Sequence, residues 1–165
     1  MEVIRRMRFT ILVIAIGAAV AFWLFRKYRV APSLDVEHLS LTTLDGVRFD
    51  ATELRGKTLF VNYWATWCGQ CLNEMPSIEE AYNQTDHDKV VFLMITDDSP
   101  EKVKKFLDRN PYPMKFVCLN QRLQEIGINT IPTSYIYDDE GYELFTHVGE
   151  LDWSDAGIVQ LLSRQ

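Results

Sequence analysis

Two cysteines lie close enough in the sequence to form a disulfide with each other: Cys68 and Cys71, separated by Gly69 and Gln70. The run Thr58–Tyr63 before them is apolar and of strand length, and a four-residue turn follows it. We therefore predict that a helix begins near Cys68. A thiol at a helix start faces unpaired backbone N–H groups and the positive end of the helix dipole, and both favour the thiolate.

The spacing of the two cysteines lets a disulfide open and close without refolding. Residues three apart on a helix have Cα atoms about 5 Å apart, which is inside the range that a disulfide tolerates. We expect Cys68 to attack a disulfide in another protein and Cys71 to resolve the mixed intermediate. The predicted active group is thus a redox pair that needs no further cofactor.

Half of a zinc site is the alternative interpretation of this spacing, and it requires two further ligands. The remaining cysteine and the histidines are scattered along the chain: Cys118, His38, His87 and His147. We therefore predict no metal. Cys118 lies in an apolar run, where a small buried residue of the core is expected.

The elements that must position the cysteines alternate between strand and helix patterns from residue 31 onward. Predicted strands are Thr58–Tyr63, Val90–Thr96, Lys115–Leu119 and two hairpins, Leu39–Leu44 with Val47–Phe49 and Ser134–Tyr137 with Tyr142–Val148. Predicted helical segments run from Cys68 to about Tyr82, from Ser99-Pro100, over Leu123–Ile126 and over Asp152–Leu162. This order predicts an α/β domain with a mixed sheet covered on both faces.

The first thirty residues differ from the rest in charge and hydropathy. They hold six basic residues and one acidic one, whereas residues 31–165 hold eleven basic and twenty-two acidic residues. Phe9–Phe25 is an uncharged run that spans roughly 25 Å as a helix, with three basic residues on each side. We predict a membrane anchor over residues 1–30, with a transmembrane helix at about 9–25 in contact with lipid, and a second domain over 31–165. A cleaved signal peptide is the alternative, and the acidic body argues against nucleic acid as a partner.

Several segments, in order and spacing, resemble the thioredoxin-like superfamily, and in particular its membrane-anchored TlpA/ResA/CcmG group of thiol–disulfide oxidoreductases. The resemblance covers nearly all of residues 34–165. It implies a thioredoxin fold with an N-terminal β-hairpin extension. The segments that carry it are Asn62-Tyr63-Trp64-Ala65-Thr66-Trp67-Cys68-Gly69-Gln70-Cys71, Glu74-Met75-Pro76 and Ile126-Gly127-Ile128-Asn129-Thr130-Ile131-Pro132-Thr133.

The resemblance also implies roles for residues outside the redox pair. Pro132 would be a cis-proline beside the disulfide, and the backbone of Ile131 would pair with an extended client chain. Trp64 and Trp67 would shield the thiols, with Trp67 part of the client-binding surface. An ordinary core or surface aromatic is the alternative interpretation of each. Thioredoxin itself has a buried aspartate where this chain has Asn62, so that proton acceptor is missing.

Glu74 stands where this group often carries an acidic residue. A carboxylate near Cys71, held partly away from water, could take its proton during resolution. An ordinary solvated acid on the helix surface is an equal alternative.

The function that the resemblance implies is reduction of disulfides in envelope proteins, of the cytochrome c maturation type. It further implies a bacterial cell-membrane location with the catalytic domain on the extracytoplasmic side, protein clients that contain disulfides, and a membrane thiol donor. An envelope oxidant or isomerase is the alternative enzyme. A non-catalytic peptide-binding module is the alternative from another class, although such a module need not keep both cysteines.

Overall fold

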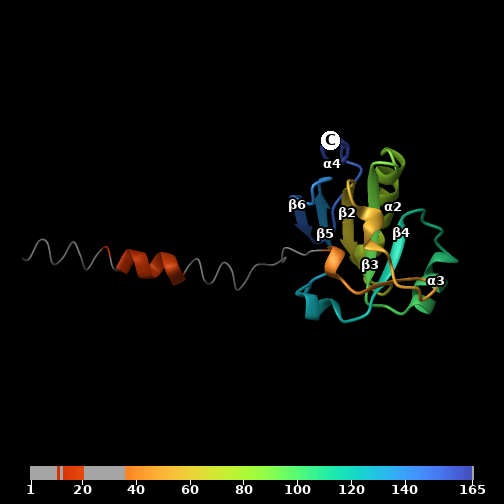
Figure 1. Cartoon of the computed structure of the whole chain (residues 1–165), viewed down its shortest axis with the longest axis horizontal. Helices are drawn as coiled ribbons and strands as arrows, with labels where there is room; N and C mark the ends of the chain where they lie inside the picture. Colours follow the sequence, from red (N-terminus) through yellow and green to blue (C-terminus); the bar gives the residue numbers. More distant parts are fainter. Residues whose placement is uncertain (1–10, 12, 21–35, 165) are drawn as a thin grey trace, which may run out of the picture. The chain divides into compact units, whose positions relative to one another are not determined.

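The computed structural model describes Ile11, residues 13–20 and residues 36–164 (Figure 1). The chain divides into two compact units, Met1–Val30 and Ala31–Gln165, each of which is described by itself. In the first unit, Ile11 and residues 13–20 are helical, and the rest of the predicted membrane segment 9–25 lies outside the described residues. No helix within the described part is long and apolar enough to cross a membrane.

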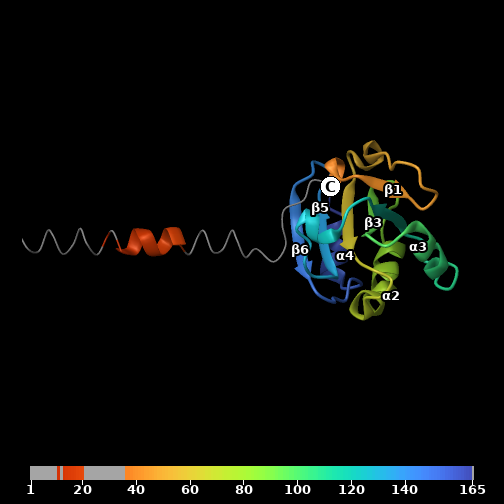
Figure 2. The same cartoon turned by 90° about the horizontal axis from the view of Figure 1, so that it is seen from below.

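The second unit is built on one six-stranded mixed sheet in the order β1-β4-β3-β2-β5-β6. Its two inner pairs, β2–β3 and β3–β4, are parallel, and the pairs that involve β1, β5 or β6 are antiparallel. Figure 1 shows β6, β5, β2, β3 and β4 side by side, and Figure 2 shows β1 at the end of the sheet away from β6. The strands are β1 Leu41–Thr43, β2 Thr58–Tyr63, β3 Val90–Thr96, β4 Lys115–Leu119, β5 Thr133–Tyr137 and β6 Glu143–Val148.

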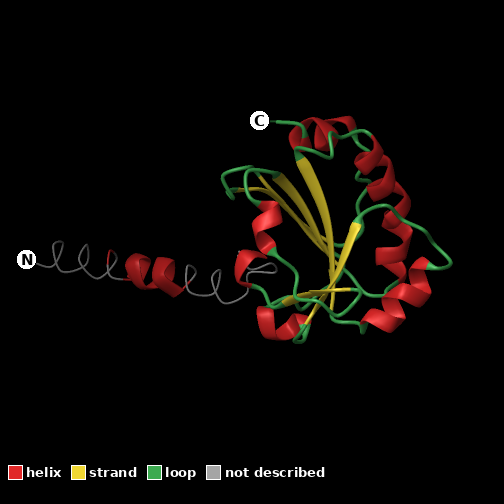
Figure 3. Cartoon of the chain, turned by 45° about the vertical axis from the view of Figure 1, so that its right-hand side comes forward, coloured by secondary structure: helices red, strands yellow, loops and turns green. Residues whose placement is uncertain are grey.

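Helices lie on both sides of this sheet, as Figure 3 shows. The α-helices are α2 Gly69–Asn83, α3 Pro100–Leu107 and α4 Ala156–Leu162. The shorter 3-10 helices are η1 Val36–His38, η2 Ala51–Leu54 and η3 Leu123–Ile126. All three α-helices contribute to one hydrophobic core, and all three 3-10 helices contribute to the other.

The alternation of side chains along each strand explains the two cores. Phe60 in β2 packs in the core under the α-helices, and its neighbour Val61 packs in the core under the 3-10 helices. Both side chains are fully buried. A strand buried on both faces needs apolar residues at consecutive positions, which is why Thr58–Tyr63 lacks the polar alternation of an exposed strand.

The predicted N-terminal hairpin is only partly formed. Residues 47–49 are not a regular strand, but they run antiparallel to β1, joined by the Thr42–Arg48 bridge and by backbone hydrogen bonds from Thr43 to Val47 and from Phe49 to Leu41. The chain turns away here because Asp50 accepts a hydrogen bond from the Thr52 backbone and begins η2. On its other side, β1 pairs antiparallel with β4 at the edge of the sheet.

The predicted helix Asp152–Leu162 begins four residues too early. The side chain of Asp152 accepts hydrogen bonds from the backbone and hydroxyl of Ser154, which holds a turn there. Asp155 then caps α4 by accepting a hydrogen bond from the Gly157 backbone. Two Asx-type turns therefore delay the helix, and they leave Trp153 in a connecting segment.

Candidate functional site

The two cysteines lie where β2 gives way to α2. Cys68 is the N-cap residue of α2, and it forms a disulfide with Cys71 in the first turn, with Cα atoms 5.3 Å apart. The backbone N–H of Cys71 points at the Cys68 sulfur across 3.2 Å. The same donor would stabilise negative charge on that sulfur once the disulfide is reduced. The predicted placement of the pair at the start of a helix is confirmed.

The two sulfur-bearing residues differ in their access to solvent. Cys68 is 7% exposed and Cys71 is fully buried. Trp67, directly before Cys68, is 72% exposed and offers a flat apolar surface beside the accessible sulfur. A disulfide in another protein can therefore approach Cys68 but not Cys71.

The turn that delivers Cys68 is fixed by a buried carboxylate from another part of the chain. Asp98, which follows β3, accepts hydrogen bonds from both the backbone and the hydroxyl of Thr66, at 2.8 and 2.9 Å. Lys102 lies 3.4 Å from the other oxygen of the same carboxylate. Asp98 was not predicted as a site residue, although an acidic residue two positions after a buried strand, at the same sheet edge as Cys68, was a usable signal.

The loop before β5 forms the other wall of the site. Ile131 and Pro132 are joined by a cis peptide bond, as the resemblance implied. The carbonyl oxygen of Ile131 lies 3.8 Å from the Cys68 sulfur. The structure therefore brings Trp67, Ile131 and Pro132 to the accessible cysteine.

Trp64 does not join this surface. It is fully buried, and its ring packs against Phe106 and Phe116 in the core under the α-helices. Trp64 is thus a core aromatic, and the core in which it packs also contains Cys68 and Cys71, so a shielding role toward the thiols stays a prediction. Cys118 is also buried, and burial, followed by the nearby charge of Asp98, raises the pKa of its thiol to about 11.

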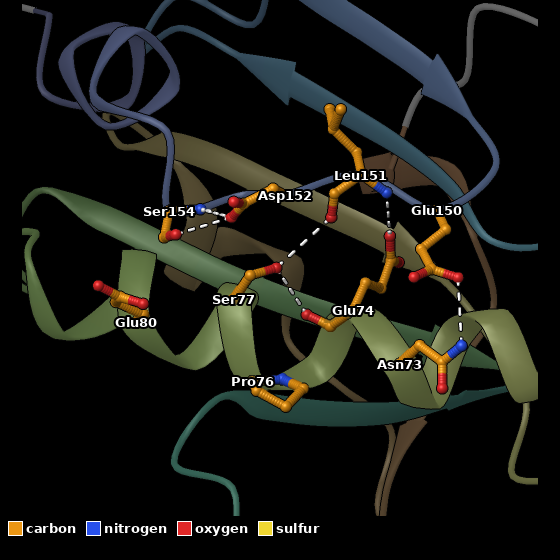
Figure 4. A pocket seen from close by; sticks show the side chains of 9 residues that line it. All are labelled: Asn73, Glu74, Pro76, Ser77, Glu80, Glu150, Leu151, Asp152 and Ser154. Carbon is orange, nitrogen blue, oxygen red and sulfur yellow. Dashed lines mark hydrogen bonds between the residues drawn. The ribbon is translucent and has the colours of Figure 1, made fainter.

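Glu74 lies one turn after Cys71 on α2, and its carboxylate is held by three donors. The side-chain amide of Asn62 donates to Oε1 at 2.7 Å, and the indole of Trp153 donates to Oε2 at 3.0 Å. The backbone N–H of Leu151 donates to Oε2 at 3.3 Å (Figure 4). The residue is 2% exposed, so the alternative of a solvated surface acid is wrong.

Burial has a direct electrostatic consequence for this carboxyl group. Loss of solvent raises the pKa of Glu74 to about 7, and the hydrogen bonds from Trp153, Asn62 and Leu151 oppose the rise only in part. A group with such a pKa can both take and return a proton near neutral pH. Glu74, one turn after Cys71 on α2, is therefore chemically suited to proton transfer near neutral pH.

Most of the residues around Glu74 were not predictable from the sequence pattern. Asn62 was considered only as the replacement of a thioredoxin aspartate, yet it joins Glu74 to Ser134, whose hydroxyl accepts from the same amide at 2.8 Å. Trp153 was assigned to a helix. Across residues 36–164, no three histidine, cysteine or acidic side chains gather in a way that could hold a metal ion.

Comparison with known proteins agrees with this geometry. The sequence pattern of the Redoxin family matches residues 28–162. Thiol-disulfide oxidoreductase ResA from a strain of Bacillus cereus is 31% identical over 153 residues, which cover 87% of each chain. Thioredoxin-like protein YneN of Bacillus subtilis (strain 168) is 34% identical over 122 residues and 68% of each chain.

Solved structures show the same fold. The thiol:disulfide interchange protein of the thioredoxin family from Chlorobium tepidum TLS superposes with a TM-score of 0.61 at 25% identity. The match covers 73% of this chain and 90% of that one. The predicted thioredoxin-like fold, with a mixed sheet flanked by helices, is confirmed.

Proposed function

We propose, from the premise that this chain belongs to the Redoxin family and is a thiol–disulfide oxidoreductase, that it reduces disulfides in protein clients outside the cytoplasm. The observation that carries the mechanism is the difference in burial between Cys68 and Cys71. A client can reach the sulfur of Cys68 but not that of Cys71. Cys68 therefore attacks the client disulfide, and Cys71 resolves the mixed disulfide.

The reaction consumes one client disulfide and the reduced Cys68–Cys71 pair. The Cys68 thiolate forms a bond to one client sulfur, and the other client sulfur leaves as a thiolate and takes up a proton. Cys71 passes its proton to the Glu74 carboxylate and attacks the Cys68 sulfur. The bond between Cys68 and the client sulfur breaks, and that sulfur leaves as a thiolate and takes up a proton from Glu74 or water. The protein then holds the Cys68–Cys71 disulfide, and the client holds two thiols.

Three further residues have roles in this proposal. Trp67 provides an exposed apolar surface for the client, and the backbone at Ile131, next to Pro132, pairs with the client as an additional strand. Both lie beside Cys68, since the Ile131 carbonyl is within 3.8 Å of its sulfur and Trp67 is its chain neighbour. The client is bound through its backbone and its disulfide, which suits a range of protein clients.

The location and partners extend the same proposal. The uncharged run 9–25 anchors the protein in the lipid of a bacterial cell membrane, with residues 31–165 on the extracytoplasmic side. A membrane thiol donor returns electrons to the disulfide after each turnover. Proteins of the cytochrome c maturation type, whose cysteines must be reduced, are the proposed clients.

The reduction potential of the Cys68–Cys71 pair tests the direction of electron flow. We expect the full chain in detergent, equilibrated with a dithiothreitol series, to give a value near that of thioredoxin, about −270 mV. Alkylation and gel shift measure the reduced fraction. A value near that of the strong oxidant DsbA, about −120 mV, would instead make the protein an oxidant.

The side of the membrane is tested by reporters fused after Gln165. Alkaline phosphatase, which needs disulfides, should be active in such a fusion, and a reporter that works only in the cytoplasm should be inactive. The matched control carries the same reporters after a chain that lacks residues 1–30. The opposite pattern of activity in the full-length fusions would contradict the envelope location.

A further inference from the structure

A groove of about 600 Å³ runs along α2 on the side where Glu74 lies (Figure 4). One wall is the exposed side of α2, and the other is the segment between β6 and α4. Every charged residue in its lining is acidic. The lining residues that concern Glu74 are Asn73, Glu80, Glu150, Leu151 and Asp152, together with Glu74 itself.

Glu74 connects this groove with the interior of the protein. Its carboxylate receives hydrogen bonds from Asn62 in the central strand β2 and from Trp153 and Leu151 in the segment after β6. The same residue lines the groove. The charge state of Glu74 is therefore open to influence from the acids at the groove rim.

Glu150 is the rim acid that is best placed for such an influence. It directly precedes Leu151, whose N–H donates to Glu74, and its own Oε2 accepts a hydrogen bond from Asn73 at 3.3 Å. Asn73 in turn directly precedes Glu74. Figure 4 shows this contact joining α2 to the opposite wall of the groove. This hydrogen bond places the Glu150 carboxylate next to the turn of α2 that carries Glu74.

We propose that Glu150 is a positioning residue for the proton of Glu74: its carboxylate, held at the groove rim by Asn73, favours the protonated form of the buried acid. This inference rests on the proposed role of Glu74 in proton transfer. The physical basis is repulsion between two like charges, which costs free energy only while Glu74 is ionised.

The surroundings of Glu74 agree with a specific effect of Glu150. Its carboxylate is the charged neighbour that raises the pKa of Glu74, in addition to the larger effect of burial. The other acids of the groove, Glu80 and Asp152, do not contribute to this shift, and Asp152 is engaged with Ser154. The remaining contacts of the Glu74 carboxylate, to Asn62, Trp153 and Leu151, are uncharged.

A direct titration of Glu74 tests the proposal. Carboxyl ¹³C NMR on the full chain in detergent, assigned with Glu74→Gln, follows its ionisation without reference to activity. Glu150→Gln keeps an acceptor for Asn73 and removes only the charge. We expect the midpoint of Glu74 to fall by roughly half a pH unit at low salt, and Glu150→Lys to lower it about twice as far. Because Glu150 is exposed, added salt should shrink both shifts.

Two control variants separate this effect from others. Glu80→Gln removes an equal charge from the same groove and should leave the midpoint where it is. Asn73→Ala releases the Glu150 carboxylate but keeps its charge, so the midpoint should fall by less than in Glu150→Gln. An unchanged midpoint in Glu150→Gln, or an equal fall in Glu80→Gln, would overturn the proposal. The Glu74 midpoint could fall as expected in Glu150→Gln while disulfide exchange by the unchanged protein does not depend on pH. That result would overturn the role of Glu74 in proton transfer and leave the effect of Glu150 on Glu74 intact.

Discussion

Cys68→Ser should reduce disulfide exchange to the rate without enzyme, and Cys71→Ser should stop the reaction half-way. Cys68 is the accessible sulfur, and a hydroxyl cannot replace a thiolate as nucleophile. Cys71→Ser keeps that nucleophile but cannot resolve the mixed disulfide. We expect a covalent complex between Cys71→Ser and its client, visible as a band that disappears with dithiothreitol on a non-reducing gel.

The buried thiol of Cys118 provides the matched control for this experiment. Cys118→Ala should trap no client and should exchange disulfides as the unchanged protein does, because burial raises the pKa of this thiol to about 11. Alkylation of the reduced protein at mild pH should label Cys68 first. Labelling of Cys71 or Cys118 before Cys68 would show that the nucleophile has been assigned to the wrong residue.

Glu74→Gln should slow resolution by about 10²-fold and remove its dependence on pH near neutrality. In the unchanged protein, resolution needs the carboxylate form, so its rate should rise with pH through the pKa of about 7. Glutamine has the same shape but cannot take the proton. Rapid-mixing measurements of the decay of the mixed disulfide between about pH 5 and 9 give both results.

The surroundings of Glu74 can accept glutamine without a cavity. The glutamine oxygen can accept from Trp153 and Leu151, while its NH₂ group faces Asn62. The amide oxygen of Asn62 is buried without a hydrogen-bond partner, so a half-turn of that amide supplies the acceptor that glutamine needs. A slow variant with a pH profile like that of the unchanged protein would exclude proton transfer by Glu74.

Stability should respond to pH in the direction that a raised pKa requires. Between the ordinary glutamate value of 4.5 and about 7, the folded protein holds a proton on Glu74 that the unfolded chain has released. The free energy of unfolding should therefore fall as pH rises through this window and level off above it. Glu74→Gln should lack this slope, which chemical denaturation at several pH values measures.

The central strands were predictable because each is a continuous apolar run between turn residues. β2, β3 and β4 have the predicted bounds, as does the helical turn η3. The redox pair was predictable for a similar reason, since its chemistry depends on two residues three apart. The bounds of segments that depend on side-chain caps were harder to predict from the sequence. The start of α4 after Asp155, later than predicted, is an example.

The roles of the two neighbouring tryptophans depended on tertiary packing. Trp64 and Trp67 flank the same short turn, yet one is fully buried and the other is 72% exposed. The rings that enclose Trp64, from Phe106 and Phe116, come from α3 and β4. No pattern within the turn itself distinguishes the two residues.

The disulfide and the hydrogen bonds of Glu74 differ in how much of the fold they require. The disulfide joins residues three apart, so an unfolded chain can already form and exchange it. The donors to Glu74 from Asn62, Leu151 and Trp153 lie 12, 77 and 79 residues away, so they meet only when the sheet and the last connection are in place. The unfolded chain therefore already has the cysteine spacing needed for a disulfide, whereas the hydrogen bonds that hold Glu74 exist only in the folded domain.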